Sequence, residues 1–361
     1  MRQKYRYILI IFVVINIVSF CFGQFTRNII EIDKKISIES KILKETRDIY
    51  IYLPEGYDQS EKSYPVMYVL DGETNFFISS AIASFMSFGR NGQIPQMIVV
   101  GIPNIARMRD FTPIPVQERI NSGGADNFIE FLDKELIEYI NNTYRTNDYR
   151  ILFGHSLCGM FSMYTLITNP SLFQSHIAAS PFLMYGDDYV INKAKEILSN
   201  QPNLSNQIYL SKGDEPDYTN SLDKFTSLLT NNSPRINWTL KTYINENHNS
   251  VPFRTIADGL AFIFSDMPLT DDIVLKGVEA IKEHVNNCIT KYGFAIEIFE
   301  YNVELYQNSA NVYDSLGDAY DRQGLKKKAI NSYKQAVYIG QKSNDANLQA
   351  YKSNLDRLIN Q

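Results

Sequence analysis

The chain has 361 residues, of which 44% are hydrophobic and 21% are charged, and its formal net charge is −5. That composition is typical of globular proteins and excludes a disordered, collagen-like or polytopic membrane chain. A net negative chain has no general attraction for nucleic acid or anionic lipid, so nucleic-acid binding is excluded. At roughly 150 residues per domain, the length predicts more than one folded unit.

The N-terminus has the pattern of a secretory signal peptide. A short basic segment (residues 1–7) precedes a mostly apolar run (residues 8–22), which is short for the ~20 residues that cross a bilayer. Small residues at the end of this run fit cleavage after Gly23. We therefore expect a signal peptide over residues 1–23 and export of residues 24–361 to the periplasm or the extracellular space, with no stable membrane span. An uncleaved membrane anchor is the alternative.

Cysteine and histidine usage implies neither a structural disulfide nor a metal site. After cleavage only Cys158 and Cys288 remain, and we expect them to lie in different domains. The four histidines are too scattered along the chain to form a metal-binding pattern. The sequence therefore predicts no metal and no cofactor.

Residues 24–268 are expected to form an α/β domain, because short apolar runs alternate there with amphipathic stretches. A helical pattern covers Asn127–Tyr144. Strand-like runs occur at Asp48–Leu53, Pro65–Leu70, Met97–Val100, Ile151–Phe153, Ile208–Leu210 and Trp238–Ile244. This alternation predicts a three-layer sandwich with a mostly parallel sheet that is buried on both faces.

Residues 269–361 are expected to form a second, all-helical unit. Its pattern, aromatic-x₂-Leu-Gly-x₂-Tyr then Ala-x₃-aromatic-x₂-Ala, is close to a tetratricopeptide repeat and consists of Tyr313, Leu316, Gly317, Tyr320, Ala329, Tyr333 and Ala336. Three repeats are normally needed for independent stability, and here one full repeat and a preceding half are visible. We expect this unit to lean on the first domain or on another subunit, and to offer a surface for a protein partner or self-association. A plain helical cap is the alternative.

A nucleophile elbow is predicted at Ser156. The segment Tyr149–Phe153, which contains the strand-like run Ile151–Phe153, leads into Gly154-His155-Ser156-Leu157-Cys158-Gly159, and a helical pattern follows. A serine on a tight turn between a strand and a helix N-terminus is exposed for attack, and the helix amides can stabilise an oxyanion. The usual glycine two residues after the serine is Cys158 here, and we expect this side chain to pack inward. The alternatives are a solvated serine on a glycine-rich turn and, more weakly, Cys158 as the nucleophile.

A serine nucleophile needs a base and a carboxylate that orients the base. His248 follows the last strand-like run, at the sheet edge where the elbow is also expected. His155 adjoins the serine and is better interpreted as a packing or orienting residue. The acid should follow the run Ile208–Leu210, on a loop with three candidates that spacing alone does not separate, namely Asp214, Glu215 and Asp217.

Ordered motifs from about residue 38 to residue 265 resemble the putative-esterase (esterase D-like) family of α/β hydrolases. The motifs are Tyr52-Leu53-Pro54, Gly56-Tyr57, Tyr64-Pro65-Val66, Leu70-Asp71-Gly72, Ile98–Pro103, Arg107-x-Arg109-Asp110, Gly123-Gly124, the elbow and Glu246–Pro252. That family includes siderophore-lactone, feruloyl and acetyl-xylan esterases, S-formylglutathione hydrolase and mycolyltransferases. Some bacterial members carry a similar helical tail.

The resemblance implies roles for individual residues. Ser156 corresponds to the nucleophile and His248 to the general base. A Glu-Pro pair follows the penultimate strand in similar sequences, which favours Glu215 as the acid over its two neighbours. The backbone amides of Leu157 and of Gly72 or its successor correspond to the oxyanion hole.

The implied activity is hydrolysis of a small-molecule carboxylic ester, such as a siderophore lactone or an acylated saccharide, through an acyl-enzyme and without a cofactor. Arg107, Arg109 and Asp110 are expected either to line the cleft or to form structural salt bridges. Two other functions remain open. One is a binding or scaffold protein with an inactive hydrolase fold, and the other is an acyltransferase that uses the same triad.

Overall fold

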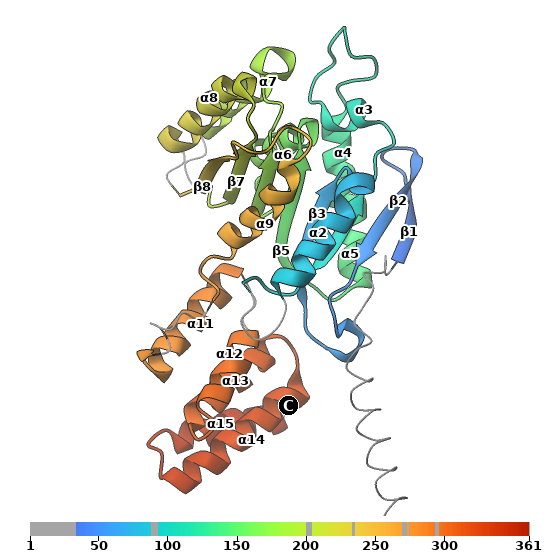
Figure 1. The fold of residues 1–361 in the computed structure, drawn as a ribbon. Helices are drawn as coiled ribbons and strands as arrows, with labels where there is room; N and C mark the ends of the chain where they lie inside the picture. Colours follow the sequence, from blue (N-terminus) through green and yellow to red (C-terminus); the bar gives the residue numbers. More distant parts are fainter. Residues whose placement is uncertain are drawn as a thin grey trace, which may run out of the picture.

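The computed structural model describes residues 34–87, 93–199, 204–232, 235–268, 273, 275–292 and 296–360. An α/β region comes first, and a series of helices follows it (Figure 1). The predicted signal peptide lies outside the described residues. None of the helices described has both the length and the hydrophobicity needed to cross a membrane.

The α/β region is built on one eight-stranded sheet with the order β1-β2-β4-β3-β5-β6-β7-β8. The strands are β1 (Lys34–Ser40), β2 (Glu45–Tyr52), β3 (Tyr64–Leu70), β4 (Ile98–Ile102), β5 (Thr146–His155), β6 (Ser175–Ala179), β7 (Gln207–Lys212) and β8 (Asn237–Thr242). The β1–β2 and β2–β4 pairs are antiparallel, and all other neighbours are parallel. The expected mostly parallel sheet is therefore confirmed.

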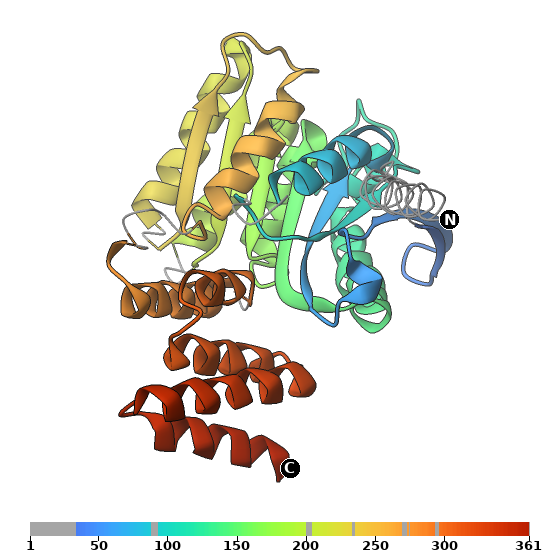
Figure 2. The ribbon, with the colours of Figure 1, turned by 60° about the horizontal axis from the view of Figure 1, so that its bottom comes forward.

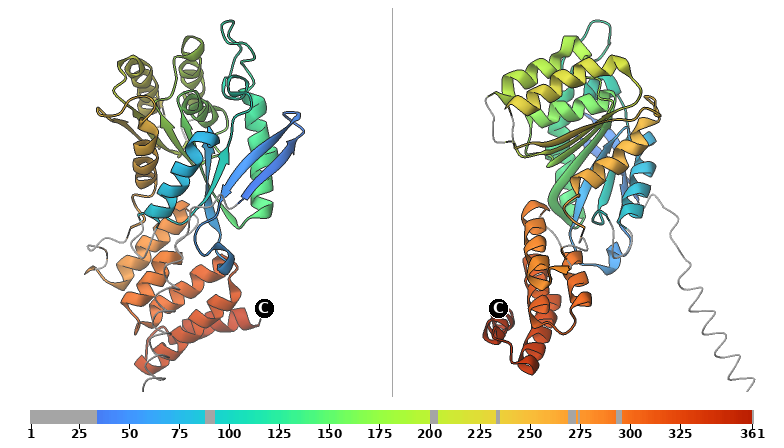
Figure 3. Two further views of the ribbon diagram at one scale, coloured as in Figure 1. Left: turned by 45° about the vertical axis from the view of Figure 1, so that its right-hand side comes forward. Right: turned by 60° about the vertical axis from the view of Figure 1, so that its left-hand side comes forward.

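Helices cover both faces of the sheet (Figure 3). One face packs against α4 (Ala125–Phe131), α5 (Ile137–Thr143), α6 (Leu157–Thr168), α7 (Tyr185–Leu198) and α8 (Pro216–Asn232). The other face packs against α2 (Gly72–Met86) and α9 (Val251–Ile263). Strands β3 and β4 are buried along their whole length, which is why their sequences are continuous apolar runs.

Two details differ from the sequence-based expectations. The helix expected over Asn127–Tyr144 consists of α4, a π-helical turn η2 (Leu132–Leu136) and α5. Strand β1 was not among the expected runs, because it is a largely exposed edge strand whose two isoleucines alternate with charged and hydroxyl side chains. Two short helices, η1 (Tyr57–Gln59) and α3 (Arg107–Phe111), complete the α/β region.

The helical region, defined here as residues 269–361, packs beneath the sheet. Its described helices are α11 (Val278–Tyr292), α12 (Ile296–Leu305), α13 (Ala310–Arg322), α14 (Lys326–Ser343) and α15 (Leu348–Ile359), and successive helices lie side by side (Figure 2). Val285 of α11 belongs to the same apolar core as Tyr149 and Phe264 of the α/β region. Lys62 also forms a 3.0 Å ion pair with Glu300. The helical region therefore leans on the α/β region, one of the two arrangements that the sequence predicted.

A close contact between α13 and α14 joins a small residue to an aromatic ring. A Cβ atom on Gly317 would lie 2.5 Å from the Tyr333 ring, so this position has no room for a side chain. The Tyr333 hydroxyl donates to Asp318 at 2.7 Å. The tetratricopeptide-like pattern predicts paired helices that approach each other where a small residue meets an aromatic ring. The assignment of this region as a repeat stays a prediction.

Candidate active site

Ser156 lies on a strained turn between β5 and α6, where the elbow was predicted. Its backbone has φ 57° and ψ −116°, a conformation that side-chain-bearing residues rarely adopt. The turn is held on both sides, since the Ser156 N–H donates to the Ala179 carbonyl at 2.9 Å and the Phe182 N–H donates to the Ser156 carbonyl at 3.0 Å. Gly154 is required, because a Cβ there would lie 2.2 Å from the Cys158 carbonyl oxygen.

Glu215 is the carboxylate that contacts His248. Its Oε1 atom lies 2.5 Å from His248 Nδ1. Its Oε2 atom accepts hydrogen bonds from the Gly213 N–H, at 2.9 Å, and from the Ser180 hydroxyl. Burial acts to raise the pKa of Glu215, but hydrogen bonds from Ser180, Gly213 and His248 outweigh it and hold that pKa below its ordinary value. The carboxylate is therefore ionised at neutral pH.

The two other candidate acids are exposed, Asp214 on the loop before α8 and Asp217 in the first turn of α8. Asp214 and Asp217 both face solvent. The backbone N–H of Asp214 donates to the Glu246 carbonyl at 2.7 Å, which fastens this loop to the one that carries His248. The geometry thus separates Glu215 from its neighbours, which spacing in the sequence could not do.

Two other rings contact the His248 imidazole. The His155 ring centroid lies 4.5 Å from that of His248, and the Tyr218 ring centroid lies at 5.4 Å. Burial, followed by the charge of His248, lowers the pKa of His155 to about 4, so His155 is neutral at pH 7. The His155 ring packs against that of His248, and its role as a packing or orienting residue stays a prediction. Tyr218, whose ring contacts that of His248, was missed by the sequence analysis.

The start of α2 supplies the second candidate part of an oxyanion hole. Asp71 has φ 51°, and α2 begins at the next residue, Gly72. A Cβ on Gly72 would lie 2.5 Å from the Ile102 backbone nitrogen, so a side chain does not fit. Gly72 and Leu157 are each the first residue of a helix, where the backbone amide has no intrahelical acceptor. Both amides carry the positive end of a helix dipole.

Arg107 connects the start of α2 to the elbow. Its Nε and Nη2 atoms contact the two carboxylate oxygens of Asp71 at 2.9 and 3.0 Å. The same Nη2 atom lies 3.4 Å from the His155 carbonyl oxygen and 3.9 Å from Cys158 Sγ. The Arg107 side chain as a whole is 37% exposed. Arg107 therefore braces the two helix starts, through Asp71 on one side and the His155 carbonyl on the other.

The neighbouring charged residues of the Arg107 motif form a structural network. Arg109 contacts Glu45 at 2.6 Å and Asp110 at 2.7 Å. Asp110 also pairs with Arg47, and the side chains of Asp110 and Arg47 are almost fully buried. The sequence left open whether Arg109 and Asp110 line the cleft or form structural salt bridges. In the structure they form salt bridges.

The described residues were also searched for reactive thiols and for groups of side chains that could bind a metal ion. The thiol of Cys158 is fully buried, and burial raises its pKa well above the ordinary value, so it packs inward as expected. Cys158 and Cys288 are both free thiols. In the part of the chain that the structure describes, no three His, Cys, Asp or Glu side chains are grouped to hold a metal ion.

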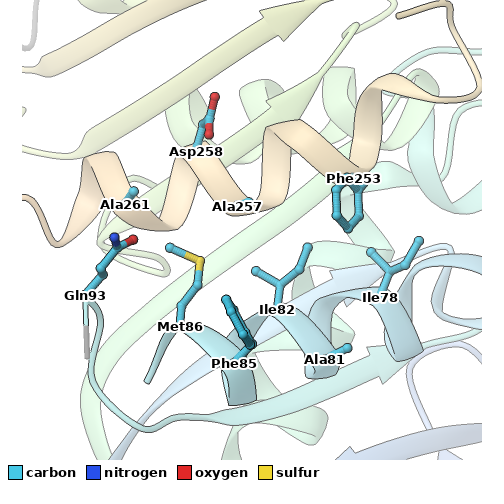
Figure 4. Close-up of a pocket in the computed structure, with 10 residues that line it drawn as sticks. All are labelled: Ile78, Ala81, Ile82, Phe85, Met86, Gln93, Phe253, Ala257, Asp258 and Ala261. Carbon is cyan, nitrogen blue, oxygen red and sulfur yellow. The ribbon is translucent and has the colours of Figure 1, made fainter. Parts of the chain in front are cut away.

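An apolar pocket of about 460 Å³ lies between α2 and α9, apart from these side chains (Figure 4). Residues from both helices line it, including Ile78, Ile82, Phe85, Met86, Phe253 and Ala257. None of Ser156, Glu215 and His248 is among its lining residues. The pocket is therefore a feature separate from the candidate triad.

Comparison with known proteins identifies the family. Residues 40–254, more than half of the chain, match the family model Esterase, described as "Putative esterase". The chain belongs to this Esterase family. The match confirms the predicted resemblance and supports an ester-hydrolysing enzyme over a scaffold protein. It does not test the individual site residues.

Characterised relatives act on siderophore esters. The chain is 31% identical to the ferri-bacillibactin esterase BesA of Bacillus subtilis, over 44% of this chain and 63% of that protein. The chain thus spans less than two thirds of the length of BesA. It is 24% identical to the siderophore triacetylfusarinine C esterase of Aspergillus fumigatus, over 56% of this chain and 82% of that protein.

Solved structures share the fold. An IroE-like serine hydrolase from Shewanella oneidensis has a TM-score of 0.68 and 27% identity, over 84% of this chain and 99% of that chain. An uncharacterised protein from Capnocytophaga ochracea has a TM-score of 0.63 and 17% identity, over 91% of this chain and 99% of that chain, which shows the fold alone. Residues 1–268 are about three quarters of the sequence, so both matches extend into the helical region.

Proposed function

We propose that this chain is a serine esterase that hydrolyses a carboxylic ester through an acyl-enzyme on Ser156. The observation that carries the proposal is the 2.5 Å contact between Glu215 Oε1 and His248 Nδ1. The His248 ring also contacts that of His155, the residue before the serine on the strained strand-to-helix turn. A carboxylate on Nδ1 leaves Nε2 as the basic nitrogen of a neutral imidazole. Asp214 and Asp217 have no part in this assignment.

The reaction has two halves. Ser156 Oγ attacks the ester carbonyl carbon while His248 Nε2 takes the serine proton. His248 then gives this proton to the leaving alkoxide, which departs as an alcohol. Water next attacks the acyl-serine with His248 again as the base, and the carboxylic acid leaves as Ser156 regains its proton. The ionised Glu215 orients the imidazole and stabilises the imidazolium in both halves.

The carbonyl oxygen becomes an oxyanion in each half. We assign its stabilisation to the backbone amides of Leu157 and Gly72. Each such donor is typically worth about 3 kcal/mol in the transition state. Arg107 fixes the distance between the two helix starts, through Asp71 on one side and the His155 carbonyl on the other.

A siderophore ester is the substrate class that the relatives favour over an acylated saccharide. The support is the esterase activity for which two relatives are named, on ferri-bacillibactin and on triacetylfusarinine C. A screen of a triscatecholate trilactone, a fusarinine ester and an acetylated xylo-oligosaccharide, with the products separated by chromatography, tests this preference. Faster cleavage of the saccharide would reverse it.

The central test is turnover of p-nitrophenyl acetate and butyrate, together with labelling by a fluorophosphonate probe. We expect both signals in residues 24–361 and neither in Ser156→Ala. Absence of labelling in a folded wild-type protein would refute the serine mechanism. Labelled protein that transfers its acyl group to an added alcohol faster than to water would make it an acyltransferase.

Export is a further part of the proposal. The basic and apolar pattern of residues 1–23 supports it. N-terminal sequencing of the protein recovered from the periplasm or the medium should begin at Gln24. A protein that keeps Met1 and sediments with membranes would instead carry an uncleaved anchor.

For the helical region we propose a tetratricopeptide-like unit. The Gly317–Tyr333 contact and the extensive pairing of α13 with α14 support it. Light scattering over a range of protein concentrations tests whether this unit mediates self-association. A constant monomer mass would leave packing on the α/β region as its structural role.

A further inference from the structure

Ser180 follows strand β6, which lies between the strand that leads to the candidate nucleophile and the strand that leads to the candidate acid. Strand β6 pairs with β5 on one side and with β7 on the other. Ser156 comes directly after β5, and Glu215 comes shortly after β7. The turn that follows β6 therefore adjoins both of these segments.

The backbone of this turn is bonded to both neighbours. The Ala179 carbonyl accepts from the Ser156 N–H at 2.9 Å, and the Phe182 N–H donates to the Ser156 carbonyl at 3.0 Å. On the other side, the Ser180 N–H donates to the Ser211 carbonyl in β7 at 2.8 Å. Ser180 has φ 39°, a strained value that persists only where the surrounding structure fixes it. The place of the Ser180 side chain is thus set by the elbow and by β7.

The hydroxyl of Ser180 donates to Glu215. Ser180 is fully buried, and Glu215 Oε2 accepts from its hydroxyl and from the Gly213 N–H at 2.9 Å. The other oxygen, Oε1, lies 2.5 Å from His248 Nδ1. Burial raises the pKa of Glu215, and the hydrogen bond from Ser180 is the largest contribution that lowers it again. One carboxylate oxygen is thus held by the protein, and the other is left for the imidazole.

A glutamate at the acid position has more freedom than an aspartate would have. Its side chain contains one more rotatable bond, and the torsion next to a carboxylate is broad instead of confined to three staggered angles. A donor on a neighbouring strand restricts this torsion, because rotation of the Glu215 carboxylate would break its bond to Ser180.

We propose that Ser180 is a positioning residue of the candidate triad, whose hydroxyl turns the Glu215 carboxylate so that Oε1 faces His248. The inference rests on the proposed esterase function and extends it. In this role Ser180 acts only through Glu215. Its effect on the reaction should therefore vanish when the carboxylate is absent.

The experiment is a double-mutant cycle, in which Ser180→Ala is made in the wild type and in Glu215→Ala. The matched control is Ser211→Ala. Ser211 is also a fully buried serine, on the adjacent strand β7, but its hydroxyl is bonded to that of Thr255 at 2.6 Å. The measured quantities are the second-order rate of fluorophosphonate labelling, kcat and KM for p-nitrophenyl butyrate, and Tm.

Loss of a hydrogen bond to a charged group predicts a labelling rate and a kcat about tenfold lower in Ser180→Ala, with KM unchanged. In the Glu215→Ala background the same substitution should change both rates by less than about twofold, because effects are not additive when one residue acts through the other. Ser211→Ala should keep the wild-type rates. A purely structural role of Ser180 would lower Tm and would change the rates, if at all, equally in both backgrounds.

Wild-type rates in Ser180→Ala, or an equal loss in both backgrounds, would overturn the inference. Ser180→Gly carries the test if Ser180→Ala does not fold, because glycine adopts φ 39° without a Cβ penalty. Failure of both variants to fold would make the hydroxyl a requirement of the fold and would also overturn the inference. Failure of the proposed function looks different, since the wild-type protein itself is then not labelled.

Discussion

The edge of the sheet that carries the candidate site and the helical region differ in how their backbones are built. Three non-glycine residues with positive φ follow three strands of the sheet, namely Asp71 after β3, Ser156 after β5 and Ser180 after β6. In the described part of the helical region, the one non-glycine residue with positive φ is Asn344, at the end of α14. Each such residue costs on the order of 1–3 kcal/mol, and such strain collects at functional sites.

The comparison also extends to side chains. The sheet edge brings together ionised and neutral polar groups that fix one another, as in the Ser180–Glu215–His248 chain of contacts. The helical region relies on small residues that fit against rings, as Gly317 does against Tyr333. Substitutions at the edge should therefore change chemistry with little loss of stability, and substitutions in the helical region should do the reverse.

The largest effect is expected from Glu215→Gln. A neutral amide neither stabilises the imidazolium nor fixes the tautomer of His248, so kcat should fall by a factor on the order of 10³–10⁴. Asp214→Asn and Asp217→Asn are the matched controls at two exposed neighbouring positions. Both should stay within about twofold of the wild type, because no contact of either side chain with His248 is seen. A fall in kcat for either control that matches the fall for Glu215→Gln would move the acid to that position.

Acidification should destabilise the α/β region through two histidines, the partly buried His155 and the fully buried His176. Burial lowers the pKa of His155 to about 4 and, in β6, that of His176 to about 3. Both are protonated in the unfolded chain below a pH of about 6.5 but stay neutral in the fold, so the free energy of unfolding decreases as the pH falls. Between pH 7 and pH 5 this amounts to about 2 kcal/mol per histidine.

Urea unfolding at the two pH values measures this loss. His176→Asn removes one titrating ring, so the difference between pH 7 and pH 5 should shrink by about 2 kcal/mol. The variant also loses the 3.0 Å hydrogen bond between His176 and Ser162, which lowers stability at both pH values alike. An unchanged pH dependence would show that His176 titrates equally in the folded and unfolded chain.

In the helical region, Gly317→Ala should cost about 1–3 kcal/mol of stability, because its new Cβ would overlap the Tyr333 ring. Gly340→Ala is the control, and a smaller loss of stability is expected there. Its Cβ would lie 3.1 Å from the Tyr351 ring, and alanine favours a helix. Thermal unfolding checks both. Labelling of Ser156 by a fluorophosphonate should stay at the wild-type rate, and a lower rate would contradict the contrast between the two regions.

The smallest effect is expected from relief of strain at the nucleophile. Ser156→Gly should be more stable than Ser156→Ala by about 1 kcal/mol, because glycine adopts φ 57°, ψ −116° without a Cβ penalty. Both variants lack the hydroxyl, so their difference in Tm isolates the backbone term. Equal Tm values would show that the turn is not strained.

Sequence reasoning succeeded where the signal is local. The elbow was predictable because a buried strand, a small residue, the serine and a helix follow one another within a dozen positions. The identity of the acid was not predictable from spacing, because the course of the backbone decides which of Asp214, Glu215 and Asp217 faces the histidine. Only the resemblance to other esterases favoured Glu215. That choice agrees with the contact to His248.

Tyr218 and β1 show two other limits. Tyr218 stands three residues after Glu215 at a helix start, a spacing that puts both on one side of the turn, but nothing in the sequence says that His248 lies opposite. Strand β1 owes its existence to pairing with β2, since its own side chains are mostly exposed. Contacts of this kind form only in the folded chain, so the hydrophobic periodicity of the sequence does not indicate them.

The core that Tyr149 and Phe264 share with Val285 has a consequence for how such a chain could evolve. A hydrolase that lost the helical region would bring this apolar underside to water, where it would promote aggregation. We therefore expect family members that end near the position of Met267 to carry polar residues on the matching face of α9. In this chain the two regions share one core, so exchange of either region alone would expose apolar side chains of the other.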